Sequence, residues 1–309
     1  MKLFRDLAEL PNELRGGAIA IGNYDGVHRG HARIIGRLIA QARRVAGPAL
    51  VFTFDPHPVR ILRPSHAPPP LTWTDRKAEL LEELGVDAMV AYPTDEALLA
   101  LSPQDFFDRI VVGALAAKAI VEGPNFFFGH NRQGTIETLR QFAAAAKIEL
   151  EVVPPVEIDG EMVSSSRVRK LIAAGRVEDA AHLLTRPYRI RGMVTHGAGR
   201  GAKIGFPTAN VDAIDTLLPG VGVYAGRAIT TGGIWPAAIN IGPNPTFGEH
   251  ALKVEVHLID FHGTLYGQPL EVDFLARIRD VHPFPGLVAL RTQLEQDVAV
   301  AKQLAATNP

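Results

Sequence analysis

The sequence predicts an α/β layered unit with a parallel sheet, followed by a smaller, all-antiparallel β unit that ends in a helix. Three observations predict this. The 309 residues are enough for two domains of ordinary size. Up to residue 184, short apolar runs alternate with helical patterns, which is typical of parallel strands joined by crossover helices. After residue 185, short strand-like segments separated by turns indicate a small antiparallel barrel or sandwich.

In the first half, each apolar run is short enough for a buried strand and is followed by a segment with helical spacing. Ligands of such folds bind beyond the carboxyl ends of the strands. Segments rich in Gly, Pro, His and Asn follow three of these strands, so we expect the site there. The predicted strands are Ala18–Ile21, Ala49–Phe54, Ala88–Tyr92 and Ala119–Glu122, and the predicted helices are His31–Val45, Asp75–Leu84 and Gln104–Ala117.

The second half begins where a helix over Val177–Leu184 runs into Arg186 and Pro187, so we expect domains over 1–184 and 185–309. Turn residues such as Thr231–Gly233 separate its strands. A single helix over Gly286–Ala306 has an apolar face that we expect to pack on the barrel. The predicted strands are Tyr188–Thr195, Gly222–Ile229, Ile234–Ile241, Leu252–Phe261 and Leu270–Phe274.

Composition excludes several classes of function. There are 32 Lys and Arg against 33 Asp and Glu, a formal charge of −1, which argues against non-specific nucleic-acid binding. The absence of cysteine excludes disulfides, thiolate zinc sites and cysteine nucleophiles. The charged N-terminal stretch is no secretory signal. The longest apolar stretch, Ile110–Val121, contains Lys118 and is too short to span a membrane. We therefore expect a soluble cytoplasmic protein that binds neither nucleic acid nor a membrane.

The strongest motif is the glycine loop Gly22-Asn-Tyr-Asp-Gly-Val-His-Arg-Gly-His31, which has a predicted strand before it and a predicted helix after it. His28 and His31 are three residues apart at the start of a helix and share a face. The amides and the dipole of a helix N-terminus favour an anion. Gly30 removes a side chain where a nucleotide could approach, so the motif predicts a polyphosphate site. Two polar residues that only cap a surface helix are the simpler alternative, and a zinc site would need further ligands.

Three further segments carry groups that suit phosphate, magnesium or proton transfer. Val163–Arg169 places three hydroxyls and an arginine at a helix start that runs to Ala174, where they either cap the helix or contact phosphate. The glycine-rich Gly197–Gly205 offers amides to phosphate, and Thr208 and Asn210 follow it with neutral oxygens that Mg²⁺ accepts. Glu255 lies on a strand face opposite apolar neighbours, where most carboxylates are simply solvated.

The chain resembles the bacterial bifunctional riboflavin kinase/FMN adenylyltransferases, also called FAD synthetases. The long histidine motif carries the resemblance, together with Phe54–Pro58, Leu101–Pro103, Gly123–Gly129 and Ser164–Arg169. Gly205-Phe-Pro-Thr-Ala-Asn210, the Val-Glu-Val-His string that contains Glu255, Asn240–Gly242 and Pro245–Phe247 extend it over the second half. The resemblance implies a Rossmann-like nucleotidylyltransferase domain and a riboflavin kinase β-barrel.

The resemblance also implies roles for particular residues. The implied catalytic residues are Glu255, the base of the kinase, and His28 and His31 of the adenylyltransferase. The implied metal ligands are Thr208 and Asn210, for Mg²⁺. The adenylyltransferase would bind ATP through Gly22, Asn23, Asp25, Gly30, Ser164, Ser165, Ser166 and Arg169. The kinase would bind ATP through Gly199, Gly201, Lys203 and Gly205. Flavin would contact Asp55, His57, Asn125 and Arg279.

The implied activity is phosphorylation of riboflavin by ATP to FMN, followed by adenylylation of FMN with a second ATP to FAD and pyrophosphate. The sequence departs from the family pattern at Phe127, Thr135, Val281 and Pro283, all on the flavin side, and Ser166 replaces a usual threonine. Two other functions stay open: an adenylyltransferase for a different phosphate substrate, and a flavin-binding protein without turnover. The oligomeric state does not follow from the sequence.

Overall fold

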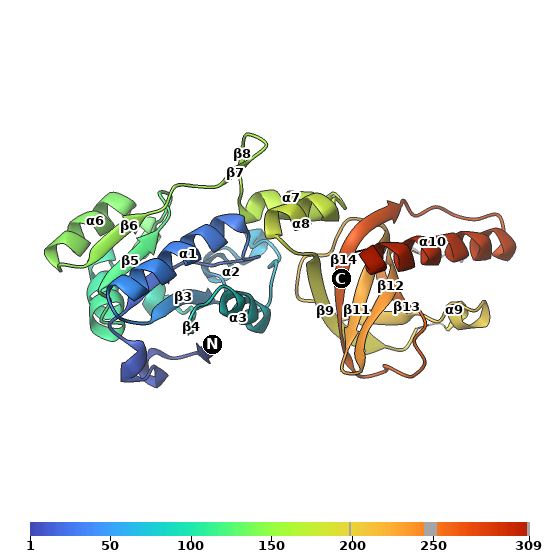
Figure 1. Cartoon of the computed structure of the whole chain (residues 1–309), viewed down its shortest axis with the longest axis horizontal. Coiled ribbons are helices and arrows are strands. Elements are labelled where there is room, and N and C mark those ends of the chain that lie inside the picture. Colours follow the sequence, from blue (N-terminus) through green and yellow to red (C-terminus); the bar gives the residue numbers. More distant parts are fainter. Residues whose placement is uncertain (198, 244–251, 308–309) are drawn as a thin grey trace. The chain divides into compact units, whose positions relative to one another are not determined.

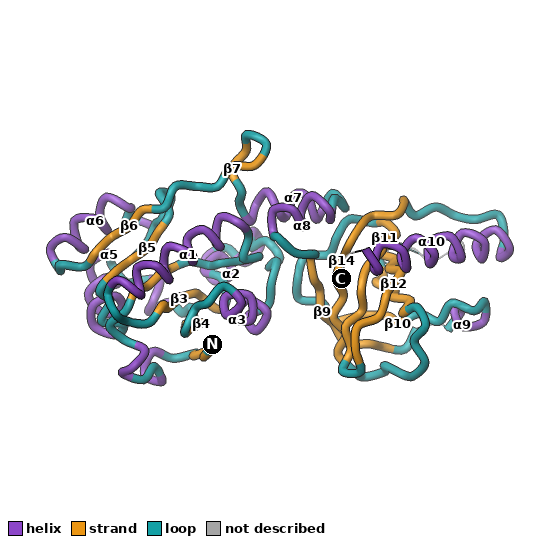
Figure 2. The backbone as a smooth tube through the Cα atoms, in the orientation of Figure 1, coloured by secondary structure: helices purple, strands orange, loops and turns teal. Residues whose placement is uncertain are grey.

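The computed structural model describes residues 1–197, 199–243 and 252–307. Packing divides the chain into two compact units, 1–68 with 73–164 and 69–72 with 165–309. The Pro245–Phe247 match lies outside the described residues. Figure 1 labels the elements of both units, and Figure 2 separates their helices, strands and loops.

The first unit is a six-stranded parallel sheet in the order β1-β4-β3-β2-β5-β6. Four of its strands cover the runs predicted from sequence, while the short edge strands β1 and β6 were not predicted. The strands are β1 (Lys2–Phe4), β2 (Ala18–Ile21), β3 (Ala49–Asp55), β4 (Ala88–Pro93), β5 (Ala119–Glu122) and β6 (Glu149–Val152). A two-stranded ribbon of β7 (Glu157–Ile158) and β8 (Glu161–Met162) lies apart from this sheet.

Helices cover both faces of this sheet because its strands are apolar on both sides. In β2, Ala18 and Ala20 face a cluster that contains Leu38 and Leu81, whereas Ile19 and Ile21 face a second cluster with Phe106. The predicted helix over Gln104–Ala117 instead divides into α5 and a π-helical segment, Phe107–Ala114. The α-helices are α1 (Arg29–Arg44), α2 (Pro58–Leu62), α3 (Thr74–Glu83), α4 (Glu96–Leu99), α5 (Pro103–Phe106) and α6 (Ile136–Ala145).

The second unit is a closed antiparallel barrel with strand order β10-β13-β12-β11-β14-β9. The predicted fold class, a parallel α/β unit followed by a small antiparallel barrel with a C-terminal helix, is confirmed. The strands are β9 (Tyr188–Thr195), β10 (Ala209–Asp212), β11 (Gly222–Thr230), β12 (Gly233–Gly242), β13 (Lys253–Leu258) and β14 (Pro269–Arg279). The helices are α7 (Ser165–Ala173), α8 (Val177–Leu184), α9 (Arg200–Lys203) and α10 (Leu287–Thr307).

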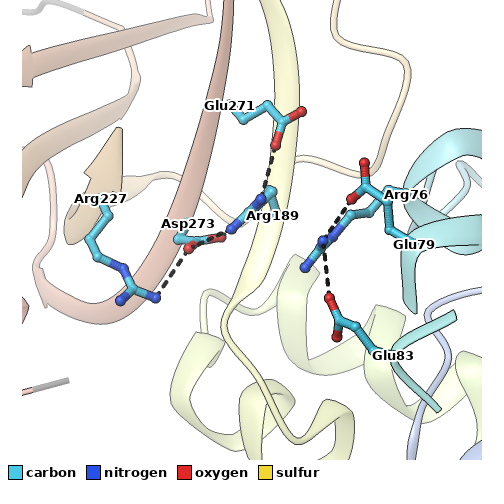
Figure 3. Close-up of polar contacts among 7 residues, drawn as sticks. All are labelled: Arg76, Glu79, Glu83, Arg189, Arg227, Glu271 and Asp273. Atoms are coloured by element: carbon cyan, nitrogen blue, oxygen red, sulfur yellow. Dashed lines mark hydrogen bonds and ion pairs between the residues drawn. The ribbon is translucent and has the colours of Figure 1, made fainter. Parts of the chain in front are cut away.

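Strand β10 was missed by the sequence analysis because it is only four residues long and directly follows a glycine- and proline-rich segment. It pairs with both β9 and β13 and thereby closes the barrel. On the barrel, Arg189 donates to Asp273 at 2.6 Å and to Glu271 at 2.9 Å, and Arg227 lies 3.2 Å from the same Asp273 (Figure 3). This ion network joins β9, β14 and β11.

Figure 3 also shows a separate ion network on α3 of the first unit. Arg76 lies 2.8 Å from Glu79 and 3.8 Å from Glu83, each one or two turns further along the helix. Both carboxylates are exposed, so this network stabilises the helix by only a few tenths of a kcal/mol per pair.

Candidate functional site

The barrel unit contains a pocket that brings together most of the residues predicted for the kinase. Thr208 and Asn210, the predicted metal ligands, line it with Glu255, the predicted base. Gly199 and Gly201 of the glycine-rich segment and Arg279 line it as well. Lys203 and Gly205 are exposed, belong to the same segment and are not part of the lining.

Glu255 owes its position to the register of three neighbouring strands. On β13 it lies opposite Asn210 of β10 and Asn240 of β12. Asn240 Nδ2 donates to the Glu255 carboxylate at 3.4 Å. Strand alternation buries Val254 and Val256 and leaves Glu255 only partly buried, so the carboxylate faces the pocket. A carboxylate held this way can accept a proton from a bound alcohol.

Glycines are needed where the glycine-rich segment passes close to the metal-ligand candidates. A Cβ on Gly197 would lie 2.0 Å from Nδ2 of Asn210. A Cβ on Gly201 would lie 2.3 Å from the Phe206 carbonyl oxygen and 3.5 Å from Oγ1 of Thr208. The backbone therefore packs directly against the residues that carry the neutral oxygens.

Arg279 is held by α10 at the same pocket. Its Nε lies 3.1 Å from both carboxylate oxygens of Asp297, and its Nη2 lies 2.7 Å from Oδ2. Asp297 is 2 % exposed, and Gln293 also donates to it at 3.0 Å. The Arg279 guanidinium lies 5.5 Å from the ring centre of Phe284. Arg279 thus fastens α10 to the barrel beside the pocket.

The rest of the pocket wall is largely apolar. Val281 and Phe284 of the segment before α10 contribute to it, as do Leu290, Leu294 and Val298 of α10. The C-terminal helix packs on the barrel as predicted, with Ala301 and Val298 against Ala225 and Ile259, while its first residue, Leu287, is 54 % exposed. An apolar wall opposite polar strand ends suits a flat heteroaromatic ring joined to a polar chain.

In the first unit, the predicted histidines lie together at the N-terminus of α1. The two imidazole rings are stacked with centroids 3.7 Å apart. His28 is the N-cap residue, since its Nδ1 accepts a hydrogen bond from the His31 N–H at 3.4 Å. A Cβ on Gly30 would come within 3.1 Å of the His28 ring, so this glycine makes room for the imidazole. His28 therefore does cap the helix, as the simpler alternative predicted. The same helix N-terminus also favours an anion.

The other residues of the histidine loop lie between β2 and α1. Gly22 packs against Tyr24, whose ring would lie 3.2 Å from a Cβ there. Asn23 has a buried side-chain oxygen that makes no hydrogen bond within the described residues, and its backbone oxygen accepts from Thr53 at 3.3 Å. Asp25 is 6 % exposed. A buried amide oxygen and a buried carboxylate are unusual for a plain surface loop.

The predicted flavin contacts of this unit differ in how they are held. Asp55 ends β3 and accepts from Thr74 Oγ1 at 2.6 Å and from Arg5 at 3.3 Å. His57 is the N-cap of α2, its Nδ1 accepting from the Val59 N–H at 3.1 Å. Asn125 is exposed after β5. Two residues further on, Phe127 is 43 % exposed, and the Arg132 guanidinium lies 4.5 Å from its ring centre.

The serine segment begins α7, and most of it belongs to the second unit. Ser164 directly precedes the helix, and Ser165 and Ser166 form its first turn. Arg169 Nε donates to the Pro69 carbonyl at 3.0 Å. A shared role of these residues with the histidines in binding ATP stays a prediction.

Sequence reasoning missed three groups near these sites: Lys77, Lys253 and Asp297. Lys253 and Asp297 line the barrel pocket. Lys77 and Asp297 are both buried, and a helical wheel gives a signal for each. Lys77 falls in line with Leu80 and Leu81, and Asp297 falls in line with Leu290 and Leu294. A charged residue at an apolar position of a helix is a reason to look for a buried partner.

The first unit is a parallel α/β fold with two histidines at the start of a helix. The second is a closed barrel with a carboxylate and two neutral oxygens of the kind that Mg²⁺ accepts. Together they indicate a two-domain nucleotide-dependent transferase. Comparison with known proteins makes this specific. Residues 10–167 match the FAD synthetase family model, and residues 184–305 match the riboflavin kinase model. The chain belongs to the bifunctional riboflavin kinase/FMN adenylyltransferase family, as the sequence resemblance predicted.

Curated relatives support this over nearly the whole chain. The bifunctional riboflavin kinase/FMN adenylyltransferase of Pseudomonas fluorescens is 39 % identical over 307 residues, 99 % of this chain and 98 % of the relative. That of Escherichia coli K12 is 34 % identical, covering 98 % of this chain and 97 % of the relative. That of Bacillus subtilis is 35 % identical, with 90 % and 89 % covered.

A solved structure has the same fold over almost its full length. A Streptococcus pneumoniae protein described as a macrolide-efflux protein superposes with a TM-score of 0.86 at 30 % identity, covering 97 % of this chain and 98 % of its own. In the part of this chain that the structure describes, no helix is both long and apolar enough to cross a bilayer.

Proposed function

We propose that this chain makes FAD from riboflavin in two steps, one in each half. The barrel transfers the γ-phosphate of ATP to riboflavin and forms FMN. The α/β unit then joins FMN to the AMP part of a second ATP and releases pyrophosphate. The observation that carries the kinase assignment is that Glu255, Thr208 and Asn210 line one pocket with an apolar wall.

In the kinase step the nucleophile is the neutral 5′-hydroxyl of the ribityl chain. Glu255 would accept its proton as the oxygen attacks the γ-phosphorus, and the bond to the β-phosphate oxygen breaks to leave ADP. The hydrogen bond from Asn240 orients the carboxylate. The apolar wall of α10 would hold the isoalloxazine ring, and Arg279 would support that wall through Asp297. Gly199, Gly201, Lys203 and Gly205 would surround the phosphates.

The donor set of the pocket fits Mg²⁺. No group of three or more His, Asp or Glu suited to a metal occurs in the described residues, but magnesium is commonly held by one or two protein oxygens together with substrate phosphates and water. The Thr208 hydroxyl and the Asn210 amide oxygen would supply the protein oxygens. The ion, when bound, neutralises charge on the phosphates of ATP.

In the adenylyl step the nucleophile is already an anion, the phosphate of FMN, so no base is needed. It attacks the α-phosphorus of ATP, and the bond to the β-phosphate oxygen breaks to release pyrophosphate. His28 and His31 would donate hydrogen bonds to the charge that develops there. Gly22, Asn23, Asp25, Gly30, Ser164, Ser165, Ser166 and Arg169 would complete the ATP site. Asp55, His57 and Asn125 would contact the flavin.

We assign adenylyl transfer to residues 1–184 and phosphoryl transfer to 185–309. Residues 165–184 pack with the barrel unit, while the FAD synthetase match ends at 167. We also propose the cytoplasm, where ATP is plentiful, as the place of work.

The direct test is a time course with the purified chain, riboflavin, ATP and Mg²⁺, with flavins separated by chromatography. FMN should appear first and FAD should accumulate later. FMN without FAD would contradict the adenylyl assignment and point to Phe127 and its neighbours. No flavin product from a folded protein would contradict both assignments and favour an adenylyltransferase for another phosphate substrate.

A further inference from the structure

His257 lies on the strand that carries the proposed base and has no part in the reactions described above. Strand alternation places its side chain on the same face of β13 as that of Glu255, and both residues line the barrel pocket. The Nδ1 atom of His257 lies 2.8 Å from the backbone oxygen of Pro207. A carbonyl oxygen only accepts hydrogen bonds, so Nδ1 carries the proton and donates. His257 is therefore tied to the residue that directly precedes Thr208.

This side-chain hydrogen bond lies where the backbone pairing of β10 with β13 ends. The last pair places Ala209 opposite Val256, so one further step of the same register brings Thr208 opposite His257. The residue before Thr208 is a proline, which has no N–H and cannot donate to the ladder. The imidazole of His257 thus connects β13 to this segment at the point where the backbone ladder stops.

The same imidazole also contacts the residue before the proline. Its ring meets the ring of Phe206 edge to face, with centroids 5.5 Å apart. Gly205, one position earlier, has a φ of +93° and is conformationally permissive. His257 therefore contacts two consecutive residues that connect a permissive glycine to Thr208. These contacts restrict the backbone from which the Thr208 side chain projects.

The position of the Thr208 hydroxyl matters because of the ion that it would serve. Mg²⁺ demands near-ideal octahedral geometry with oxygens at about 2.0–2.1 Å, and the groups that orient a metal ligand affect metal affinity as well. We propose that His257 is a positioning residue of phosphoryl transfer, whose hydrogen bond to Pro207 fixes the Thr208 hydroxyl for magnesium in the pocket of Glu255. The inference rests on the proposed kinase function.

The test compares two substitutions that divide the contacts of His257. His257→Phe keeps a ring against Phe206 and removes the donor, whereas His257→Asn keeps an N–H close to the position of Nδ1 and removes the ring. His262→Phe is the matched control, because it makes the same change at an exposed histidine of the barrel unit that does not line the pocket.

Two measurements are made on the full chain. The rate of FMN formation from riboflavin and ATP is followed over a range of Mg²⁺ concentrations. Calorimetric titration with ADP, with and without Mg²⁺, measures nucleotide binding in the absence of turnover. Any binding of ADP by the α/β unit is common to all the variants, because the substitutions lie in the barrel unit.

His257→Phe should raise the Mg²⁺ concentration for half-maximal rate at least about fivefold, the loss expected for one hydrogen bond. It should leave KM for riboflavin within about twofold of that of the natural chain. ADP binding should weaken by a similar factor of about five with Mg²⁺ present and stay unchanged without it. His257→Asn should recover most of both losses, and His262→Phe should behave as the natural chain does.

A double-mutant cycle tests whether His257 acts through Thr208. In a chain that already carries Thr208→Ala, the hydroxyl is gone and its position no longer matters. Adding His257→Phe to that chain should therefore change Mg²⁺-dependent ADP binding by less than about twofold. A further loss as large as in the natural chain would mean that the two residues act independently, which would overturn the proposal.

Unchanged Mg²⁺ dependence and ADP binding in folded His257→Phe would overturn it as well. So would failure of His257→Phe to fold, because the hydrogen bond would then serve only the packing of the barrel. If the unaltered chain makes no FMN from riboflavin, the proposed kinase function itself is wrong. A negative result confined to the His257 variants leaves that function in place.

Discussion

Glu255 and His28 differ in their surroundings, and the difference suits each to a different nucleophile. Glu255 lies partly exposed in a pocket with amide neighbours, where a carboxylate can take a proton from an alcohol. His28 is 5 % exposed, caps α1 and stacks on His31. Because its Nδ1 accepts from the His31 N–H, the proposed hydrogen bond to a phosphate would come from its Nε2.

Substitutions at these two residues should have reciprocal effects. Glu255→Gln should lower FMN formation by about 10²-fold or more, because the proton of the hydroxyl loses its acceptor. It should leave FAD formation from supplied FMN intact. His28→Ala should lower FAD formation by about 10²-fold and spare FMN formation. Steady-state rates for the two reactions, measured separately, check both; equal damage to the two activities in a folded protein would refute the division of roles.

His28→Asn distinguishes catalysis from capping. Asparagine is one of the best N-cap residues, so this variant should recover the thermal stability that Ala loses. It should not recover FAD formation, since it lacks the ring. Recovery of both would reduce His28 to a helix cap.

Glu122, at the end of β5, predicts a pH dependence of stability. It is 3 % exposed and accepts from the Ile21 N–H at 2.5 Å, yet burial raises its pKa well above the ordinary value of 4.5. Between these two values the folded chain holds a proton that the unfolded chain has released. The stabilisation that this bound proton gives the folded state is therefore complete below the ordinary pKa. It is lost as the pH rises towards the pKa of Glu122 in the folded chain.

Glu122→Gln removes that titration. Its free energy of unfolding relative to the natural chain should rise by about 1.4 kcal/mol for each pH unit crossed in the window. Denaturant unfolding of both proteins from about pH 4 to about pH 8 measures this difference. Parallel pH profiles would show that Glu122 does not titrate in this way.

At the scale of elements, a buried ion pair between Arg279 and Asp297 joins α10 to the barrel. Asp297→Ala leaves the Arg279 charge without its partner, so the free energy of unfolding should fall by about 3 kcal/mol. Because α10 also forms the apolar wall of the pocket, KM for riboflavin should rise. Glu295→Ala, at an exposed position two residues away that pairs with Arg291 at the surface, is the control and should change stability by less than about 1 kcal/mol. An Asp297 variant as stable as this control would show that α10 is held by its apolar contacts alone.

The local sequence pattern predicted some strands of the fold and missed others. Apolar runs such as Ala18–Ile21 and Ala49–Phe54 gave the central strands because both faces are buried. Strand β10 could not be found this way, since its four residues are made a strand by pairing on both sides. Glu255 was singled out through family resemblance, because a carboxylate on a half-buried strand is ordinary. Its closeness to Asn240 depends on the pairing of β12 with β13, which one-dimensional spacing does not contain.

At the scale of the whole molecule, each unit has its own core and its own proposed chemistry. Mixing His28→Ala with Glu255→Gln should therefore restore the conversion of riboflavin to FAD, with FMN released by one chain and used by the other. The mixture should show a longer lag than the natural chain, since FMN passes through bulk solution. Chromatography of the flavins over time measures both. A mixture of two folded variants that makes FMN but no FAD would mean that FMN does not leave the chain that makes it.

The strand that carries Glu255 has one further consequence, for how this protein tolerates insertions. In β13 the buried residues Val254, Val256 and Leu258 alternate with the partly exposed Lys253, Glu255 and His257. Inserting or deleting one residue within the strand would exchange these two sets, turning the glutamate inward and the valines towards the pocket. The barrel would lose its packing and its proposed proton acceptor together. The alternation of odd and even positions therefore links the packing of the barrel to the orientation of the proposed base, so that selection for folding alone preserves that orientation.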